Sequence, residues 1–199
     1  MPLTKRLHLK RYRQIIRVLV RHGFGLLLEQ LGIFAYLKIR HRKLDPYSAS
    51  AAENARQSLG ERLRLSCEEL GPTFIKIGQI LSTRPDVFSP EVAGELVKLQ
   101  DSVNTFAFAE VCQVITEEFS EPPEKVFAWI DPEPLAAASL SQVHKARLPT
   151  GQTVVIKVQR PGIAAGIKVD LEILKDLVSF VCNHTHYGTL YDFAGMMSE

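Results

Sequence analysis

Apolar residues recur every three or four positions through much of the first 121 residues, a spacing that predicts α-helices. Gly71-Pro72 interrupts this pattern, and Ser89 followed by Pro90 has the composition of a helix start. The first part of the chain is therefore expected to be all-helical, with predicted helices over 48–70, 73–82, 89–100 and 109–119.

The pattern changes in the last third of the chain. Leu140–Leu148 alternates loosely and Gln152–Val158 contains a β-branched run, with the turn residues Pro149-Thr150-Gly151 between them. This arrangement predicts an antiparallel β-hairpin. Val126–Ile130 has the composition of a first strand or a short helix, and a helical stripe follows the hairpin over Ile167–Cys182. The sequence thus predicts an α+β fold in which helices precede a small β-hairpin and a helix.

Basic residues are concentrated at the N-terminus. Eleven of the 24 Lys and Arg residues lie in the first 43 positions, which hold one acid. On a helix, the Arg6–Arg21 segment has a basic face opposite an apolar one, which suits either an anionic membrane surface or packing on the body with the basic face in water. Nucleic acid is not expected as a partner, because few aromatics accompany the basic face. The basic stripe is Arg6, Lys10, Arg13, Arg17 and Arg21, opposite Tyr12, Ile15, Ile16 and Leu19.

The following segment, Gly23–Ile39, is expected to continue as an apolar helix. Glu29 and Gln30 interrupt it, and no run reaches the roughly 20 apolar residues that span a bilayer. A transmembrane helix is therefore not predicted. A signal peptide is not predicted either, because no small-residue cleavage site follows the basic region. The cysteines are far apart and favour reduced thiols, so we expect an intracellular, cytoplasmic protein. The cysteines are Cys67, Cys112 and Cys182. The basic helix adds the expectation of peripheral membrane association.

Two polar residues lie within the otherwise apolar Thr73–Ser82 segment. Lys76 and Gln79 are three positions apart and share one helix face, and Gly78 between them permits close backbone approach. Burying a lysine is unfavourable unless it is paired, so this face is expected to border a polar cleft. The alternative is that Lys76 extends to solvent.

A run of small residues, Ala136-Ala137-Ala138-Ser139, comes directly before the hairpin and is expected to form a turn. Small side chains let backbone N–H groups approach a phosphate. Lys157 follows in the second strand within a V-x-I-K sequence, which is the layout of a kinase nucleotide-binding lobe. On these residues alone, a tight turn and a strand-edge lysine explain the pattern equally well.

Three longer motifs occur in order: LGPTFIKIGQILSTRPD over Leu70–Asp86, PLAAASLSQVHKA over Pro134–Ala146 and VVIKVQRPGI over Val154–Ile163. Together they resemble the UbiB/AarF/ADCK family of atypical kinase-like proteins, over roughly Leu44–Ile163. The resemblance implies that Lys76, Gly78 and Gln79 form the family's K-x-G-Q motif. In the family this motif lies on a helical cap that folds over the active site and blocks access by a protein substrate.

The resemblance also implies a nucleotide site that binds ADP or ATP with Mg²⁺. Ala136, Ala137, Ala138 and Ser139 match the alanine-rich loop that replaces the glycine-rich loop and favours ADP. Lys157 matches the invariant strand lysine, and Lys157 and Lys76 are the implied catalytic residues. Family members act in ubiquinone or related isoprenoid-lipid biosynthesis, so such a lipid or its biosynthetic enzymes are expected partners.

No H-R-D or D-F-G sequence follows Lys157, and the family's E-x-D motif comes later than this chain extends. Glu172 is therefore not assigned as the partner of Lys157, and the metal ligands are expected beyond Glu199. We expect a basic helical arm over 1–43, a helical K-x-G-Q region over 44–121 and a partial protein-kinase-like N-lobe over 122–199. The expected protein is an atypical kinase or ATPase of which this chain alone is catalytically incomplete. The alternative is a non-catalytic, membrane-associated scaffold with a degenerate kinase lobe.

Overall fold

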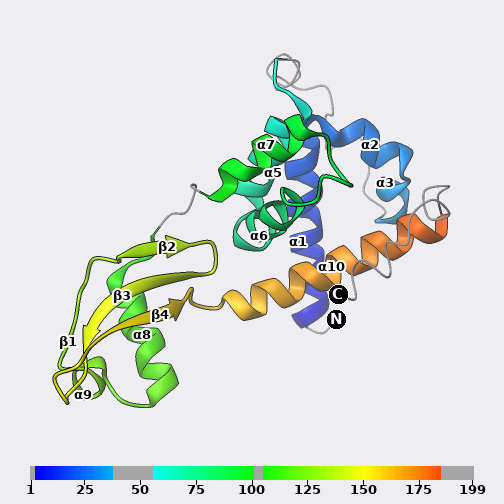
Figure 1. Ribbon diagram of the computed structural model, residues 1–199. Helices are drawn as coiled ribbons and strands as arrows, with labels where there is room; N and C mark the ends of the chain where they lie inside the picture. The colour runs from blue at the N-terminus through cyan, green and yellow to red at the C-terminus, as the bar shows by residue number, and fades with distance from the viewer. Residues whose placement is uncertain (1–2, 38–55, 101–104, 185–199) are drawn as a thin grey trace.

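The computed structural model describes residues 3–37, 56–100 and 105–184, which form a helical part and a small β-lobe (Figure 1). The predicted α+β fold, with helices followed by a partial kinase-like N-lobe, is confirmed. The helical part contains α1 (Leu3–Leu19), the π-helical turn η1 (Val20–Phe24), α2 (Gly25–Gln30), α3 (Ile33–Tyr36), α5 (Leu59–Leu70), α6 (Pro72–Leu81), α7 (Pro90–Val97) and the 3-10 turn η3 (Lys98–Gln100).

The β-lobe contains the remaining short helices and the four strands, and a long helix connects it to the helical part. In Figure 1 this helix leaves the end of β4 and crosses α1, with which it is in contact. The elements are α8 (Phe108–Phe119), α9 (Pro123–Val126), β1 (Trp129–Ile130), β2 (Ala136–Ala138), β3 (Ser141–Arg147), β4 (Thr153–Gln159) and the connecting helix α10 (Ile163–His184).

The apolar face of α1 is covered by other helices. Ile15 and Ile16 are 1% and 0% exposed. Ile15 packs in a cluster with residues of α5, α6 and α10, and Ile16 in a second cluster with residues of α2 and α3. Since this face is filled by the protein itself, α1 packs on the body, and binding of its basic face to an anionic surface stays a prediction.

The predicted continuous helix over Gly23–Ile39 is wrong for the described residues. Gly23 has φ 83° and Gly32 has φ 71°, and both positions interrupt the helical path. Glycine adopts this left-handed conformation readily, so the apolar segment is divided into α2 and α3. Residues 38 and 39 lie outside the described residues. None of the described helices combines the length and apolarity required to cross a membrane.

The predicted helix over 48–70 begins later in the described chain, because α5 starts at Leu59. Ser58 is its N-cap, and its hydroxyl accepts a hydrogen bond from the Glu61 backbone N–H at 3.1 Å. Positions 48–55 lie outside the described residues. The helices predicted over 73–82, 89–100 and 109–119 are confirmed within one residue at their starts, and η3 completes the one that begins at Pro90. The helix predicted over Ile167–Cys182 is confirmed as α10, which begins four residues earlier, at Ile163.

The predicted hairpin is confirmed as β3 and β4, which pair antiparallel from Ser141↔Gln159 to Arg147↔Thr153. β1 and β2 pair with different parts of β3, so they lie end to end along its other edge. The segment predicted as either strand or short helix contains both, since α9 precedes β1. One face of this sheet packs against α8 through a core that includes Val111, Ile115 and Val158. The other face, called the open face here, is exposed at Lys145 and Lys157, whereas Ser141 at its turn end is 2% exposed.

Candidate nucleotide-binding site

The open face of the sheet brings the predicted nucleotide residues together. Ala136 is the register partner of Val143, and Val143 is the register partner of Lys157. Directly opposed residues in a sheet project from the same face, so these three side chains form one row across β2, β3 and β4. Lys157 is exposed, whereas its neighbour Val158 is 5% exposed in the core.

The residues of this face follow the spacing of a kinase glycine-rich strand pair. The kinase signature is G-x-G-x-x-G-x-V. Here Ala136, Ala138, Ser141 and Val143 occupy the three glycine positions and the valine position. Ala138 and Ser141 are register partners, so all four positions lie on the face that carries Lys157.

The prediction of a turn over the three alanines is wrong. Ala136–Ala138 form strand β2, and the tight turn consists of Ser139 and Leu140. The Ala138↔Ser141 pair closes this two-residue turn, so the alanines continue the ladder along β3. Alternation therefore places Ala137 on the opposite face from Lys157, and Ser139 is 5% exposed in the turn.

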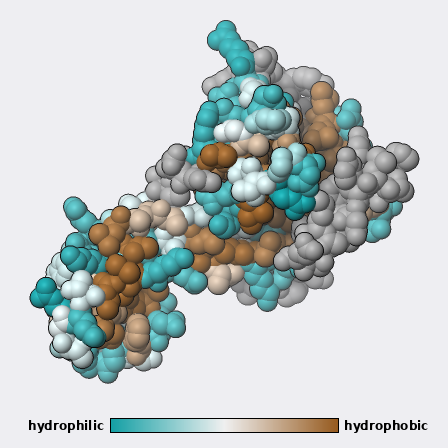
Figure 2. Space-filling model, in the orientation of Figure 1, coloured by the Kyte–Doolittle hydropathy of each residue, from teal (hydrophilic) through white to brown (hydrophobic). Residues whose placement is uncertain are grey.

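Hydrophobic side chains accompany Lys157 on the surface of the lobe. Val155 is two positions before Lys157 on the same face and is 65% exposed. Trp129 is the register partner of Arg147, also on this face, and is 45% exposed. Figure 2 shows a hydrophobic band on the β-lobe. A lysine next to exposed apolar side chains offers a phosphate contact beside a surface for a flat base.

Glu172 lies away from the lysine row. Its Oε2 atom is 3.2 Å from Nε2 of His8 on α1. Glu172 therefore faces the helical part, consistent with leaving it unassigned as the partner of Lys157.

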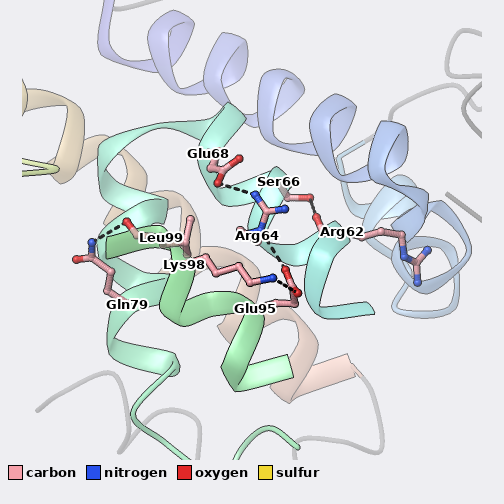
Figure 3. A network of polar contacts seen from close by, with 8 residues as sticks. All are labelled: Arg62, Arg64, Ser66, Glu68, Gln79, Glu95, Lys98 and Leu99. Atoms are coloured by element: carbon pink, nitrogen blue, oxygen red, sulfur yellow. Dashed lines mark hydrogen bonds and ion pairs between the residues drawn. The ribbon is translucent and has the colours of Figure 1, made fainter. Parts of the chain in front are cut away.

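Two residues of the K-x-G-Q motif hold η3 against α6. Gly78 is buried, and a Cβ atom at its position would lie 2.4 Å from Leu99 Cδ1. The side-chain amide of Gln79 donates a hydrogen bond to the Leu99 carbonyl at 3.1 Å. Figure 3 shows this contact between α6 and η3. The glycine and the glutamine thus fix the position of one segment, and both act on Leu99.

Lys76 is exposed on α6, so the prediction that it lies on a buried polar edge is wrong and the alternative, extension to solvent, describes its position. Thr73, Phe74, Ile75 and Gly78 provide the buried side of the helix. Lys76 belongs to the helical part and Lys157 to the β-lobe. The catalytic roles of the two lysines stay predictions.

Ion pairs support the helices behind this contact. Arg64 on α5 binds Glu68 at 2.9 Å and Glu95 on α7 at 3.2 Å, and Glu95 also pairs with Lys98 (Figure 3). The hydrogen bond from Lys98 is the main reason that the pKa of Glu95 lies below its ordinary value. The three cysteines are free, as predicted, and burial raises the pKa of the Cys67 thiol to about 11.

The sequence interpretation did not assign two buried polar residues of β3. Gln142 and His144 are both 0% exposed and lie on the core face of the sheet. The signal was present, because they occupy alternate positions of a strand whose other core residues are apolar. A polar residue at a core position needs a hydrogen-bond partner, which the sequence does not locate.

Comparison with known proteins agrees with this arrangement. Residues 98–196 match the family model of the ABC1 atypical kinase-like domain. A probable protein kinase UbiB of Sodalis glossinidius is 42% identical over 173 residues, which is 87% of this chain. The chain belongs to the ABC1 family of atypical kinase-like proteins. The ABC1 match includes β2, β3 and β4, so the row of Ala136, Val143 and Lys157 lies within it.

Other relatives of this ABC1 chain have no assigned activity in their names. An uncharacterised protein of Synechocystis sp. is 44% identical over 153 residues, covering 77% of this chain and 26% of that protein. An uncharacterised protein from the hydrogenase 1 5′ region of Clostridium pasteurianum is 40% identical over 169 residues, or 85% of this chain and 28% of that protein. The chain spans 31% of the Sodalis UbiB protein. It thus corresponds to about three tenths of these relatives.

The residues of the open face fit the phosphate side of a nucleotide better than they fit a metal. Small side chains occupy the three glycine positions, and a lysine shares their face. Within residues 3–37, 56–100 and 105–184, no group of three or more His, Cys, Asp and Glu residues is placed to hold a metal ion. The described residues of this face thus include a lysine and small side chains on neighbouring strands, which are the features that a phosphate contact requires.

Proposed function

We propose that this chain is the nucleotide-binding N-terminal part of an atypical kinase or ATPase of the UbiB type, and that it binds ADP or ATP with Mg²⁺ on the open face of its sheet. The observation that carries the proposal is the row of Ala136, Val143 and Lys157. It places the strand lysine on the same face as residues with the spacing of the kinase glycine-rich signature.

In this proposal each residue of the open face has a separate task. The Lys157 ammonium contacts the phosphates, and the small side chains of Ala136 and Ala138 let the phosphates approach the β2 backbone. Val143 and Val155 provide apolar surface for the base. When bound, Mg²⁺ would neutralise part of the charge of the phosphates.

The metabolic role of the whole protein is also a proposal. The motifs that resemble the UbiB/AarF/ADCK family support a role in the synthesis of ubiquinone or a related isoprenoid lipid. Such a lipid, or the enzymes that make it, would then be the partner of the complete protein. The proposal concerns the longer protein, since the matched relatives are about three times the length of this chain.

Nucleotide binding is tested by thermal unfolding of the 199-residue chain with Mg-ADP and Mg-ATP. A ligand at about 100 times its dissociation constant stabilises the folded state by about 2.7 kcal/mol. We expect stabilisation by both nucleotides, a larger effect of Mg-ADP at equal concentration, and loss of both effects in Lys157→Ala. The matched control is Lys145→Ala, since Lys145 is exposed on the same face, one row away. Equal losses in both variants, or no stabilisation of the wild type, would contradict the proposal.

The partner at the basic helix is proposed to be an anionic membrane surface. Lys10, Arg13 and Arg17 are exposed on α1, whereas Arg21 pairs with Glu69. The apolar face of α1 is covered, so binding would be electrostatic and without insertion of that face. Each basic residue near such a surface contributes about 1 kcal/mol, and salt weakens the attraction.

Replacing Lys10, Arg13 and Arg17 by Glu should abolish co-sedimentation with vesicles that contain phosphatidylserine. The control is the same substitution at Lys125, Lys145 and Arg147, which changes net charge equally but lies in the β-lobe. Binding that persists after reversal of the α1 charges would leave the helix with a packing role alone.

A further inference from the structure

Gln142 and His144 occupy the core of the β-lobe directly behind the open face. Both are 0% exposed. They alternate along β3 with Ser141, Val143 and Lys145, which lie on the face of Lys157. These residues are consecutive on one strand, so a shift of the backbone at Gln142 or His144 also shifts the positions of Ser141 and Val143.

Hydrogen bonds determine the protonation of His144. Its Nδ1 atom lies 2.8 Å from the Asp131 carbonyl oxygen, which only accepts, so Nδ1 carries the hydrogen. Its Nε2 atom lies 3.1 Å from Nε2 of Gln142, whose amide nitrogen donates, so Nε2 of His144 accepts. Both nitrogens of the imidazole are thus engaged in hydrogen bonds.

The other contacts of Gln142 are to the backbone of Phe106. The Gln142 amide donates to the Phe106 carbonyl at 3.3 Å, and its side-chain oxygen accepts from the Phe106 N–H. The amide group thus binds both polar backbone groups of one residue, as a neighbouring strand would. Since Gln142 is fully buried, losing either contact would leave a buried polar group unsatisfied.

Phe106 is also bound through its ring. The Arg160 guanidinium carbon lies 5.1 Å from the ring centroid, and the Arg160 backbone N–H donates to the Leu140 carbonyl at 2.9 Å. Arg160 directly follows β4, and Leu140 belongs to the turn between β2 and β3. Phe106 therefore contacts β3 and the end of β4.

We infer that Gln142 and His144 are positioning residues of the nucleotide site: Gln142 holds the backbone of Phe106, and His144 holds Gln142 and the Asp131 carbonyl. The inference rests on the proposed nucleotide binding. By holding β3 to Phe106, the pair fixes where Ser141 and Val143 lie, and the ladder between β3 and β4 extends this control to Lys157.

The test compares Gln142→Leu with Val111→Ala in the full 199-residue chain. Leucine fills a similar volume without polar atoms, and Val111 on α8 is a fully buried member of the same core without polar contacts. Calorimetric titration with Mg-ADP, at a temperature where both variants are folded, should give a dissociation constant raised about tenfold in Gln142→Leu and changed by less than about twofold in Val111→Ala. NMR should show faster amide hydrogen exchange at Phe106 in Gln142→Leu alone.

A milder variant serves if Gln142→Leu does not fold. In His144→Asn, the side-chain amide nitrogen donates to the Asp131 carbonyl as Nδ1 does, but Gln142 loses its acceptor. Weaker Mg-ADP binding by this variant supports positioning. An unchanged dissociation constant in the folded variants, or an equal change in Val111→Ala, overturns positioning while wild-type binding upholds the nucleotide proposal. Absence of Mg-ADP binding in the wild type overturns both proposals.

Discussion

Replacing Asp170 by alanine is expected to lower the free energy of unfolding by about 3–5 kcal/mol. Asp170 on α10 is 3% exposed and accepts two hydrogen bonds from Arg11 on α1, at 2.7 Å from Nε and 2.9 Å from Nη2. Arg11 Nη2 also donates to the Leu70 carbonyl at the end of α5 at 2.8 Å. Without Asp170, the partly buried guanidinium of Arg11 loses its counter-ion. Urea unfolding followed by circular dichroism measures the loss.

Glu172→Ala is the matched control on the same helix. Glu172 is exposed and pairs with His8, so we expect its loss to change the free energy of unfolding by no more than about 1 kcal/mol. The double variant Arg11→Met/Asp170→Leu should recover much of the stability, because it removes both charges and keeps apolar volume. Equal effects of Asp170→Ala and Glu172→Ala would contradict a structural role for the buried pair.

Gly78→Ala is expected to destabilise the chain by about 1–3 kcal/mol, although alanine favours helices. The added Cβ atom would lie 2.4 Å from Leu99 Cδ1, and Leu99 is 0% exposed, so little space exists for it to move. The glycine of the K-x-G-Q motif thus permits close packing of α6 on η3. The midpoint and slope of urea unfolding measure the effect.

Gly94→Ala provides the comparison for that substitution. Gly94 lies in α7, and a Cβ atom there would meet nothing within 4 Å. Alanine should stabilise the chain at this position by about 0.5–1 kcal/mol, through its helix propensity. Combining Gly78→Ala with Leu99→Ala should cost less than the two single losses together, because the shortened side chain leaves space for the added methyl group. Stabilisation by Gly78→Ala itself would contradict the packing explanation.

The sequence predicted the elements whose signal is local. The hairpin has its own turn residues and β-branched run, and α7 begins at Ser89 and Pro90, as their capping preferences predict. The motifs that resemble the ABC1 family are also local strings. The position of Lys157 on a strand of the nucleotide lobe could therefore be predicted from the sequence.

The errors arose where long-range contacts decide. Alanine has weak strand propensity, so Ala136–Ala138 were expected to form a turn, but pairing with β3 makes them a strand. Lys76 lies in a segment that is apolar on most sides, but packing buries the opposite side of α6 and leaves the lysine exposed. Neither outcome is specified by the residues nearest in the sequence.

By itself, then, the sequence determined the α+β order of elements, the family motifs and the residue types of the candidate nucleotide site. The tertiary structure alone decided which residues share the face of Lys157, because strand register is set by pairing between segments. It alone brought Gln142 to the Phe106 backbone, 36 residues away in the chain, and His144 to the Asp131 carbonyl. Local sequence encodes backbone preference, whereas the partner of a buried polar group is chosen by the packing of distant segments.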